Sequence, residues 1–413
     1  MGLPGVTPVV DLQLTCFLLA AISAGTALGT ATGLVPGLHA NNVALVLASV
    51  AAGLPGPPLA IAAAMLAAGV AHTFLNAIPA LAIGVPDAEM AVSALPGHRL
   101  VRNGRGREAI RLSVLGSALA VVVAVPLAIP ITGLMLRGYP LIVANLRVIL
   151  AVVVVGMLAM EHTRRSRAAG ALTFFGAAAL GWGFLDADPA APLAAGGVLA
   201  PLFAGLFGAP ILLEAMRGGG VPPQGDAAIC TRPSAVGATA LAGTIAGAVV
   251  GYLPGISAAI AAVAVLVAMP GDISDRGYLI ATSGVDTANS IFALFALWAI
   301  GSPRTGVLVG VDRLGAPLNI PILIASVLLA GGLSAAVTLT VGDRYLSVVG
   351  SIDHRIVAGA VLALLVGISF LFAGALGIGL FVAATCVGMI PVRFGAFRVH
   401  CMGVLIGPML LAT

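Results

Sequence analysis

Residues 25–37 read GTALGTATGLVPG, and residues 243–255 read GTIAGAVVGYLPG. A second pair of segments, AIGVP at 82–86 and AIGSP at 299–303, matches at an offset of 217 positions. The first pair matches at an offset of 218, where Gly25, Thr26, Gly29, Gly33, Pro36 and Gly37 recur as Gly243, Thr244, Gly247, Gly251, Pro254 and Gly255. Two blocks in the same order at nearly the same offset indicate an internal duplication. The glycines recur at every fourth position and line one helix face in each copy, where we expect close helix–helix packing.

The duplication predicts two transmembrane repeats, residues 1–216 and 235–413, joined by the polar linker 217–234. Apolar runs bounded by Gly, Pro or charged residues lie near 10–33, 38–54, 58–85, 110–135, 139–160, 169–186, 191–215, 235–253, 256–269, 277–301, 318–342, 352–371, 373–391 and 398–412. Seven of these fourteen runs precede the second repeat, so the two repeats are predicted to have opposite orientations in a membrane. Inverted repeats are typical of many secondary transporters.

The composition excludes an ordinary soluble protein. Of 413 residues, 60% are hydrophobic and only 8% are charged, whereas soluble domains carry about 25% charged residues. The same numbers exclude a disordered chain, which needs low hydrophobicity and high charge. We therefore predict an all-α polytopic membrane protein with about 12–14 helical elements.

The charged residues and cysteines limit the partners. All 19 basic residues are arginines in short gaps between apolar runs, so there is no continuous basic face for nucleic acid. The four cysteines have no spacing typical of a metal site. We therefore expect neither a metal centre nor a cofactor. Na⁺ stays open as a coupling ion.

The arginines also predict the orientation of the chain. Fifteen lie in odd-numbered gaps between runs, three lie in even-numbered gaps, and Arg147 lies within a run. Cytoplasmic loops carry an excess of Arg and Lys. The odd gaps are therefore predicted to be cytoplasmic and the N-terminus to lie outside, in a multi-pass protein of the plasma membrane.

The runs 38–54 and 256–269 are shorter than the ~20 residues that cross a bilayer, and each follows a Pro-Gly turn. We expect broken helices or re-entrant hairpins there, whose free N–H groups suit a carboxylate or phosphate. An ordinary turn outside the membrane is the alternative. The predicted substrate-binding residues at these turns are Pro36, Gly37, Leu38, His39, Asn41, Asn42, Pro254, Gly255, Ile256 and Ser257.

Polar residues inside two further runs complete the predicted site. His72 and Asn76 are assigned to substrate binding. An ionisable residue within a membrane span is a functional candidate by default, so Asp286 is assigned to ion coupling together with Asn289 and Ser290. The alternative for Asp286 is a structural ion pair with Arg304 or Arg147.

Four segments resemble a known family. They are GLVPGLHANNVAL and HTFLNAIPALAIGVPDAEMAVSALPGHRLVRNGRGREAIRLSVLGS in the first half, and GYLPGIS and DTANSIFALFALWAIGSP in the second. In this order they look like the large membrane subunit of the tripartite tricarboxylate transporters, in its stand-alone archaeal branch. The resemblance implies an ion-coupled importer of organic polycarboxylates that works with a periplasmic binding protein and a small membrane subunit.

Residues and resemblance together predict a secondary transporter that moves a di- or tricarboxylate-like anion by alternating access, coupled to Na⁺ or H⁺. A transporter of an isoprenoid-linked phosphate lipid is the alternative. An intramembrane enzyme using His39, His72 or Ser257 is a third class, but neither HExxH nor GxSxG occurs. A homodimer is one open assembly, and the binding-protein and small-subunit partners stay open as well.

Overall fold

The structure is a computed structural model that describes residues 11–36, 56–84, 94–193, 197–216, 222–225, 228–253 and 275–411, together with Ala258 and Ala261. The described residues contain helices and no strand, and seven helices are long and apolar enough to cross a membrane. The prediction of an all-α polytopic membrane protein is confirmed.

Most helices of the first half follow the predicted runs, with one correction. The helices are α1 (Leu12–Gly33), α3 (Pro58–Leu75), α4 (Ala77–Ala82), α5 (Ala94–Arg102), α6 (Gly106–Ala144), α7 (Leu146–Ala159), α8 (Arg164–Phe184), α9 (Leu199–Phe203), the π-helix η1 (Ala204–Gly208) and α10 (Ala209–Ala215). The gap predicted at 136–138, between the runs 110–135 and 139–160, is helical, and the break between α6 and α7 lies at Asn145 instead. The short run predicted at 38–54 lies outside the described residues.

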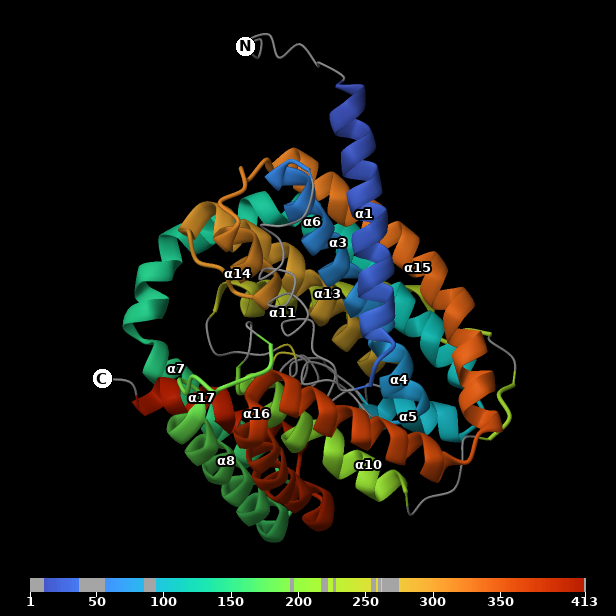
Figure 1. Cartoon of the computed structure of the whole chain (residues 1–413), viewed down its shortest axis with the longest axis vertical. Helices are drawn as coiled ribbons and strands as arrows, with labels where there is room; N and C mark the ends of the chain where they lie inside the picture. Colours follow the sequence, from blue (N-terminus) through green and yellow to red (C-terminus); the bar gives the residue numbers. More distant parts are fainter. Residues whose placement is uncertain are drawn as a thin grey trace.

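The second half begins after the linker. Its helices are α11 (Pro233–Tyr252), α13 (Asp275–Ile300), α14 (Gly306–Arg313), α15 (Ile320–Ser351), α16 (His354–Phe394), the 3₁₀-helix η2 (Arg398–Met402) and α17 (Gly403–Leu411). The short run predicted at 256–269 lies outside the described residues apart from two alanines. Figure 1 shows α1, α3, α11 and α13 in the upper part of the molecule and α7, α8, α16 and α17 in the lower part.

The helix α16 is broken near its middle. Ala373 and Gly374 have non-helical backbone angles, with φ of −144° and 56°. The would-be Cβ of Gly377 is 2.9 Å from the Cβ of Ala373, and it also meets the carbonyl oxygen of Ser369. A straight helix keeps residues eight apart ~12 Å from each other along its axis, so the chain turns sharply here. The two predicted runs, 352–371 and 373–391, correspond to the two arms of this broken helix.

The glycine stripes of the duplicated motif are helix-packing surfaces, as predicted. The helix α1 packs on α3, and α11 packs on α13. A Cβ on Gly33 would lie 2.8 Å from the Cβ of Leu75, and one on Gly251 would lie 2.7 Å from the Cβ of Phe292. Leu75 and Phe292 are 217 positions apart, the offset of the sequence repeat. The duplication is therefore also a repeat of helix-to-helix contacts, in which absent side chains let backbones approach closely.

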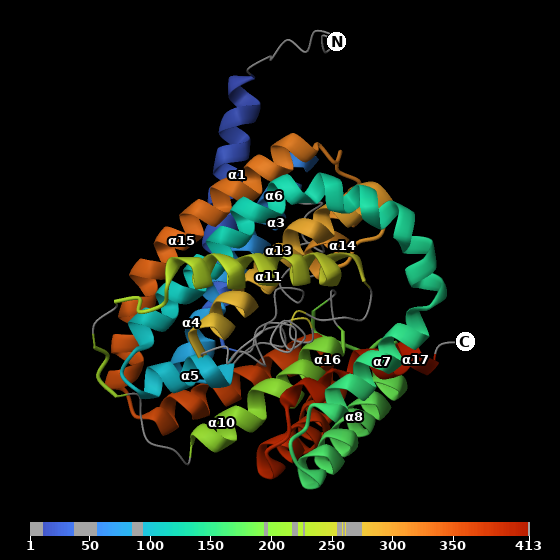
Figure 2. The same ribbon diagram turned by 180° about the vertical axis from the view of Figure 1, so that it is seen from behind.

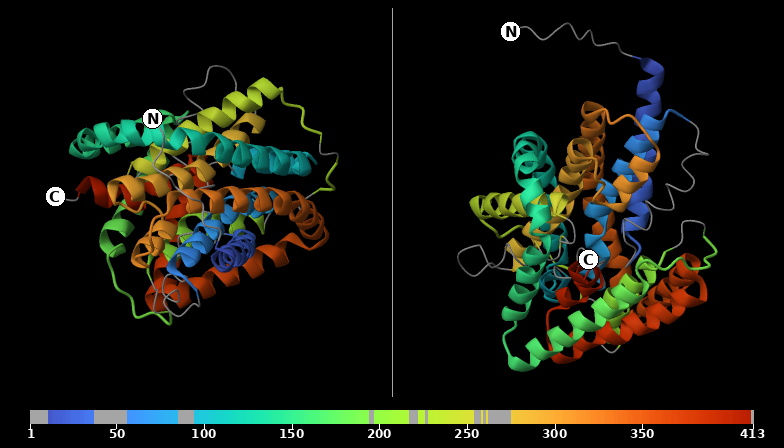
Figure 3. Two further views of the ribbon diagram at one scale, coloured as in Figure 1. Left: turned by 90° about the horizontal axis from the view of Figure 1, so that it is seen from above. Right: turned by 90° about the vertical axis from the view of Figure 1, so that its left-hand side faces the viewer.

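The long helices α6 and α15 each pack on helices of the other half. The helix α6 packs on α13 and α11, whereas α15 packs on α3. In the lower part, α8 packs on α17, and α16 packs on α9, η1 and α10. The views in Figures 2 and 3 show α6 and α15 running along α3 and α13. The three largest hydrophobic clusters of the core consequently mix residues from both sequence repeats.

Contacts between helix ends follow the predicted grouping of the gaps. Among odd-numbered gaps they include Arg99–Asp275, Arg276–Glu108, Arg107–Asp343 and His400–Glu161. Next to the even-numbered gaps 187–190 and 372, the N–H of Leu193 donates to the carbonyl of Leu371. Arg304, which lies in the even-numbered gap after α13, donates to Tyr139 near the end of α6. These contacts support two opposite faces of the molecule. Which face is cytoplasmic stays a prediction.

Candidate functional site

The repeat-related helices α3 and α13 form the buried centre of the molecule. In the most apolar stretch of α13, 94% of the residues are buried, and the corresponding share is 83% for α3 with α4. In α1 it is only 22%. The helices α3 and α13 nevertheless carry polar side chains at positions that face the interior. Buried polar groups are kept only where hydrogen bonds or a function offset their desolvation. The centre of the fold is therefore the place to look for a site.

The acid Asp286 lies on α13 in this centre and is fully buried. The side-chain Nδ2 of Asn76, at the end of α3, donates a hydrogen bond of 3.0 Å to its Oδ2. The ion pairs of the described residues include none between Asp286 and Arg147 or Arg304. Arg304 instead donates to the hydroxyl of Tyr139 and lies over its ring. The described contact with Asn76 is the one that the structure gives Asp286, and the alternative of a structural pair with Arg147 or Arg304 stays a prediction.

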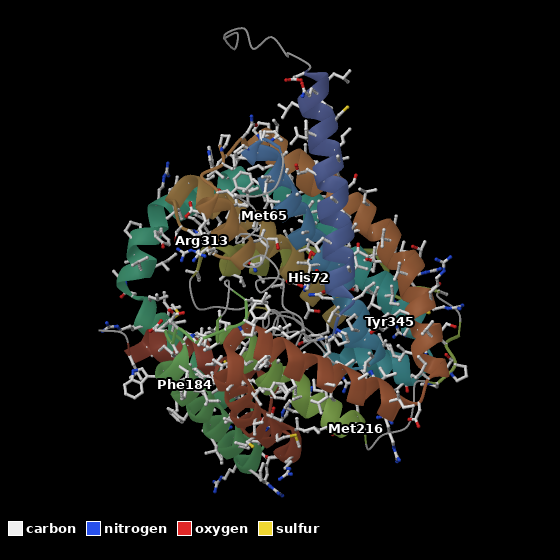
Figure 4. All side chains as sticks on the ribbon, in the orientation of Figure 1. Met65, His72, Phe184, Met216, Arg313 and Tyr345 are labelled. Carbon is white, nitrogen blue, oxygen red and sulfur yellow. The ribbon has the colours of Figure 1, made fainter. Side chains whose placement is uncertain are left out.

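Further polar contacts surround this pair. The hydroxyl oxygens of Thr73 and Thr287, which are both buried, lie 3.1 Å apart and join α3 to α13. The Nδ1 of His72 lies 3.2 Å from the hydroxyl of Thr32 on α1. Figure 4 shows His72 next to α1 in the middle of the molecule. Three helices thus bring one acid, one imidazole, one amide and three hydroxyls into the centre.

The Pro-Gly turns begin where α1 and α11 reach these helices. A Cβ on Gly33, at the end of α1, would lie 3.1 Å from the backbone nitrogen of Asn76. Pro36, three residues later, is buried. The equivalent Gly251 at the end of α11 meets Phe292. Outside the described residues lie the predicted substrate-binding residues Gly37, Leu38, His39, Asn41, Asn42, Pro254, Gly255, Ile256 and Ser257.

Asn289 and Ser290 are not joined to the Asp286–Asn76 pair. The side chain of Asn289 is 6% exposed, and its backbone nitrogen lies at the contact of α13 with Gly247 of α11. Ser290 is partly exposed. Their assignment to ion coupling stays a prediction, and the described side-chain contact of Asp286 is with Asn76.

The helix α6 adds two serines that the sequence did not single out. The hydroxyls of Ser113 and Ser283 lie 2.8 Å apart, and Ser117 donates to the carbonyl of Ser283. Between them, a Cβ on Gly116 would lie closer than 3.0 Å to the backbone of Ile280. The spacing of two serines around a glycine was visible in the sequence, but nothing there indicated that α6 packs on the other half.

No group of three or more His, Cys, Asp or Glu within the described residues could hold a metal ion. The described cysteines are free thiols, and three of them are exposed. The carboxylate of Asp286 is an oxygen donor of the kind that suits hard cations rather than soft, thiolate-bound metals.

An apolar groove of about 350 Å³ opens between α1 and α3. Gly25 and Ala64, where α1 and α3 approach closely, are among its lining residues. The described residues that line it are all apolar, namely Phe17, Ala20, Ala21, Ala24, Gly25, Leu28, Ala60, Ile61, Ala64 and Met65. Its chemistry suits a hydrocarbon chain.

Comparisons with known proteins agree with this architecture. Residues 19–403 match the tripartite tricarboxylate transporter TctA family. The chain is also 25% identical over 332 residues to the uncharacterized protein MJ1079 of Methanocaldococcus jannaschii, an alignment that covers 80% of this chain and 81% of that protein. No solved structure matches the chain. Because the match spans both sequence repeats and nearly all described helices, the chain belongs to the tripartite tricarboxylate transporter TctA family.

Proposed function

We propose that the chain is a secondary active transporter that moves a small di- or tricarboxylate-like anion across the cell membrane by alternating access. Movement of the anion is coupled to Na⁺ or H⁺ at Asp286. The observation that carries the proposal is the hydrogen bond between Asp286 and Asn76, which joins the two repeat-related helices in the buried centre. Family membership supports the transport class.

Burial of Asp286 supports its role in coupling. A carboxylate away from water is strongly destabilised unless a proton or a cation neutralises it. Neutralisation of Asp286 therefore favours the close approach of α3 and α13, and loss of the proton or cation favours their separation. In this way the ion and the arrangement of the two helices are linked, which is what coupled transport requires.

The anion would bind next to this pair. His72 and Asn76 supply polar groups on α3, and the Pro-Gly turns after α1 and α11 would supply backbone N–H groups. A cation at Asp286 lowers the electrostatic free energy of an anion nearby. Each ligand then binds more tightly when the other is present, by the same factor.

Contacts at both ends of α13 support alternating access. At one end Arg276 contacts Glu108, and at the other Arg304 contacts Tyr139, so both partners belong to α6. We infer that these two contacts break and reform in turn as α3 and α13 move against α6 and α15. The predicted orientation places the Arg276 end on the cytoplasmic side and the Arg304 end outside.

The test is uptake by the purified chain in proteoliposomes. Labelled di- and tricarboxylates are offered with an inward Na⁺ gradient, an inward H⁺ gradient or neither. We expect uptake of at least one of these anions to depend on one gradient, and Asp286→Asn to abolish that dependence. The matched control is Asp312→Asn, which removes an exposed acid near the end of α14. Gradient-driven uptake that survives Asp286→Asn would contradict the coupling role.

The same assay addresses the partners. The resemblance implies a binding protein and a small membrane subunit, whereas the stand-alone branch implies neither. Uptake by the chain alone would favour the stand-alone arrangement. A homodimer would be detected by the mass of the protein in detergent.

The apolar groove favours one second candidate, transport of an isoprenoid-linked phosphate. The groove could take the hydrocarbon tail while the buried centre takes the phosphate. A ligand of the folded state raises apparent thermal stability, by about 2.7 kcal/mol at a hundredfold excess over Kd. Stabilisation by an isoprenoid phosphate and by no carboxylate would favour this candidate over the first.

A further inference from the structure

Three exposed arginines lie at one edge of the molecule, where α8 begins and α16 ends. They are Arg164 and Arg165 in the first turn of α8 and Arg393 in the last turn of α16. The guanidinium of Arg165 lies 5.1 Å from the centre of the ring of Phe394. Figures 1 and 2 both show these two helix ends together at the lower edge. We call the three residues the α8–α16 arginine cluster.

The acids near this cluster are already occupied. Glu161 is buried and bonded to His400 and to the backbone N–H of Phe397. Glu214 faces Arg398 at 3.7 Å. Within the described part of the chain, none of the three cluster arginines forms an ion pair.

The resulting positive charge is not offset by the protein. Five arginines, namely Arg164, Arg165, Arg167, Arg393 and Arg398, stand against the two acids Glu161 and Glu214, which leaves a formal charge of 5 − 2 = +3 with His neutral. In addition, Arg164 and Arg165 occupy the positive end of the α8 dipole, where cations are unfavourable. An anion from outside the chain would remove this unfavourable electrostatic energy.

The outer face of α8 indicates where that anion comes from. Arg164, Phe175 and Trp182 are 11 and 7 residues apart, so they share one side of the helix. Phe175 and Trp182 are 65% and 73% exposed. Arg164 and Trp182 are ~27 Å apart along the axis, close to the ~30 Å of a bilayer's hydrocarbon core. The arginines therefore lie at the level of the lipid headgroups, above a face that contacts lipid tails.

We propose that the α8–α16 arginine cluster binds the phosphate of an anionic phospholipid, with an acyl chain along Leu172 and Phe175. Leu172 is 59% exposed and lies next to the same face. The cluster takes residues from both sequence repeats, and beneath it the Glu161–His400 contact joins the α7–α8 turn to η2. The bound lipid consequently holds the two repeats together at this edge. The proposal does not depend on the identity of the transported substrate.

The test uses the full chain in detergent micelles, titrated with phosphatidylglycerol or phosphatidylcholine and followed by native mass spectrometry. We expect the wild-type chain to retain phosphatidylglycerol in preference to phosphatidylcholine. A surface arginine contributes about fivefold to the binding of an anionic lipid. The variant Arg164→Gln/Arg165→Gln/Arg393→Gln should therefore lose about 100-fold in apparent affinity for the tightest phosphatidylglycerol.

The matched control is Arg102→Gln/Arg344→Gln/Arg355→Gln, which removes three exposed arginines from other parts of the same predicted face. It should leave the tightest phosphatidylglycerol bound, and the Arg→Lys version of the cluster should keep most of the affinity because it keeps the charge. Equal losses in cluster and control variants would overturn the proposal, because binding would then reflect total charge. Equal retention of both lipids by the wild-type chain would overturn it without any variant. Displacement of the lipid by glycerol phosphate at similar concentration would overturn the lipid as the natural ligand.

Discussion

The contact between α11 and α13 allows one prediction to be worked through from the structure. A methyl group on Gly243 would lie closer than 3.0 Å to the backbone of Ala281, whereas one on Gly237 of the same helix would meet no heavy atom within 4 Å. Alanine is favoured over glycine in a helix by about 1 kcal/mol, and this gain applies to both positions. Overpacking adds a cost of about 1–3 kcal/mol only at Gly243.

The difference between the two variants therefore isolates the packing term. Gly237→Ala should raise the free energy of unfolding by about 1 kcal/mol. The free energy of unfolding of Gly243→Ala should be about 1–3 kcal/mol lower than that of Gly237→Ala. At about 2 °C per kcal/mol for a chain of this size, the apparent Tm of Gly243→Ala should be ~2–6 °C lower than that of Gly237→Ala. Scanning fluorimetry in one detergent at one heating rate measures this difference. An equal or higher Tm for Gly243→Ala would refute the close approach of the two helices.

Three further predictions concern other contacts. Gly374→Ala should lower the Tm, because alanine is strained at a φ of 56° and its Cβ would meet the carbonyl of Ala190. The control Gly379→Ala should not lower the Tm, because position 379 has open space around it. Similar Tm values for the two variants would contradict the break in α16. A double-mutant cycle of Thr73→Val and Thr287→Val in the same assay should give a coupling free energy of about 1 kcal/mol between the two substitutions. Strictly additive effects on stability would show that the two hydroxyls are not hydrogen-bonded. Glu108→Gln should lower the free energy of unfolding by about 2 kcal/mol. This loss is smaller than for a fully buried ion pair because the partners Arg105 and Arg276 are partly exposed. An unchanged Tm would argue against the contacts of Glu108 with these arginines.

Much of the architecture was predictable because it depends on local rules. Apolar runs bounded by Gly, Pro and charge placed most spans, since a helix that crosses a membrane must satisfy its backbone internally. The duplicated glycines predicted close packing in both halves, and the structure confirms it at equivalent positions. The break in α16 was also predictable, as the boundary between the runs 352–371 and 373–391, because one helix of 41 residues would be ~60 Å long.

The candidate site was predictable only in part. Asp286, His72 and Asn76 were recognisable because each interrupts an apolar run. Their relation was not, since Asn76 and Asp286 are 210 positions apart and belong to different repeats. The alternative partners Arg147 and Arg304 were equally reasonable by charge. The choice depends on which helices touch, and hydropathy does not contain that information.

The sequence by itself determined the class of protein, the internal repeat and the helix-packing faces, because composition, spacing and small residues act over one helix or one turn. Only the tertiary structure decided that α6 packs on α13 and α15 on α3. That exchange brings Ser113 to Ser283 and ties α13 at both ends to α6. The tertiary structure also packs α8 on α16, and the α8–α16 arginine cluster lies where these two helices meet. In a chain whose helices are nearly all apolar, many pairings bury similar surface, so the pairing is set by the shape of small residues and by a few buried polar contacts.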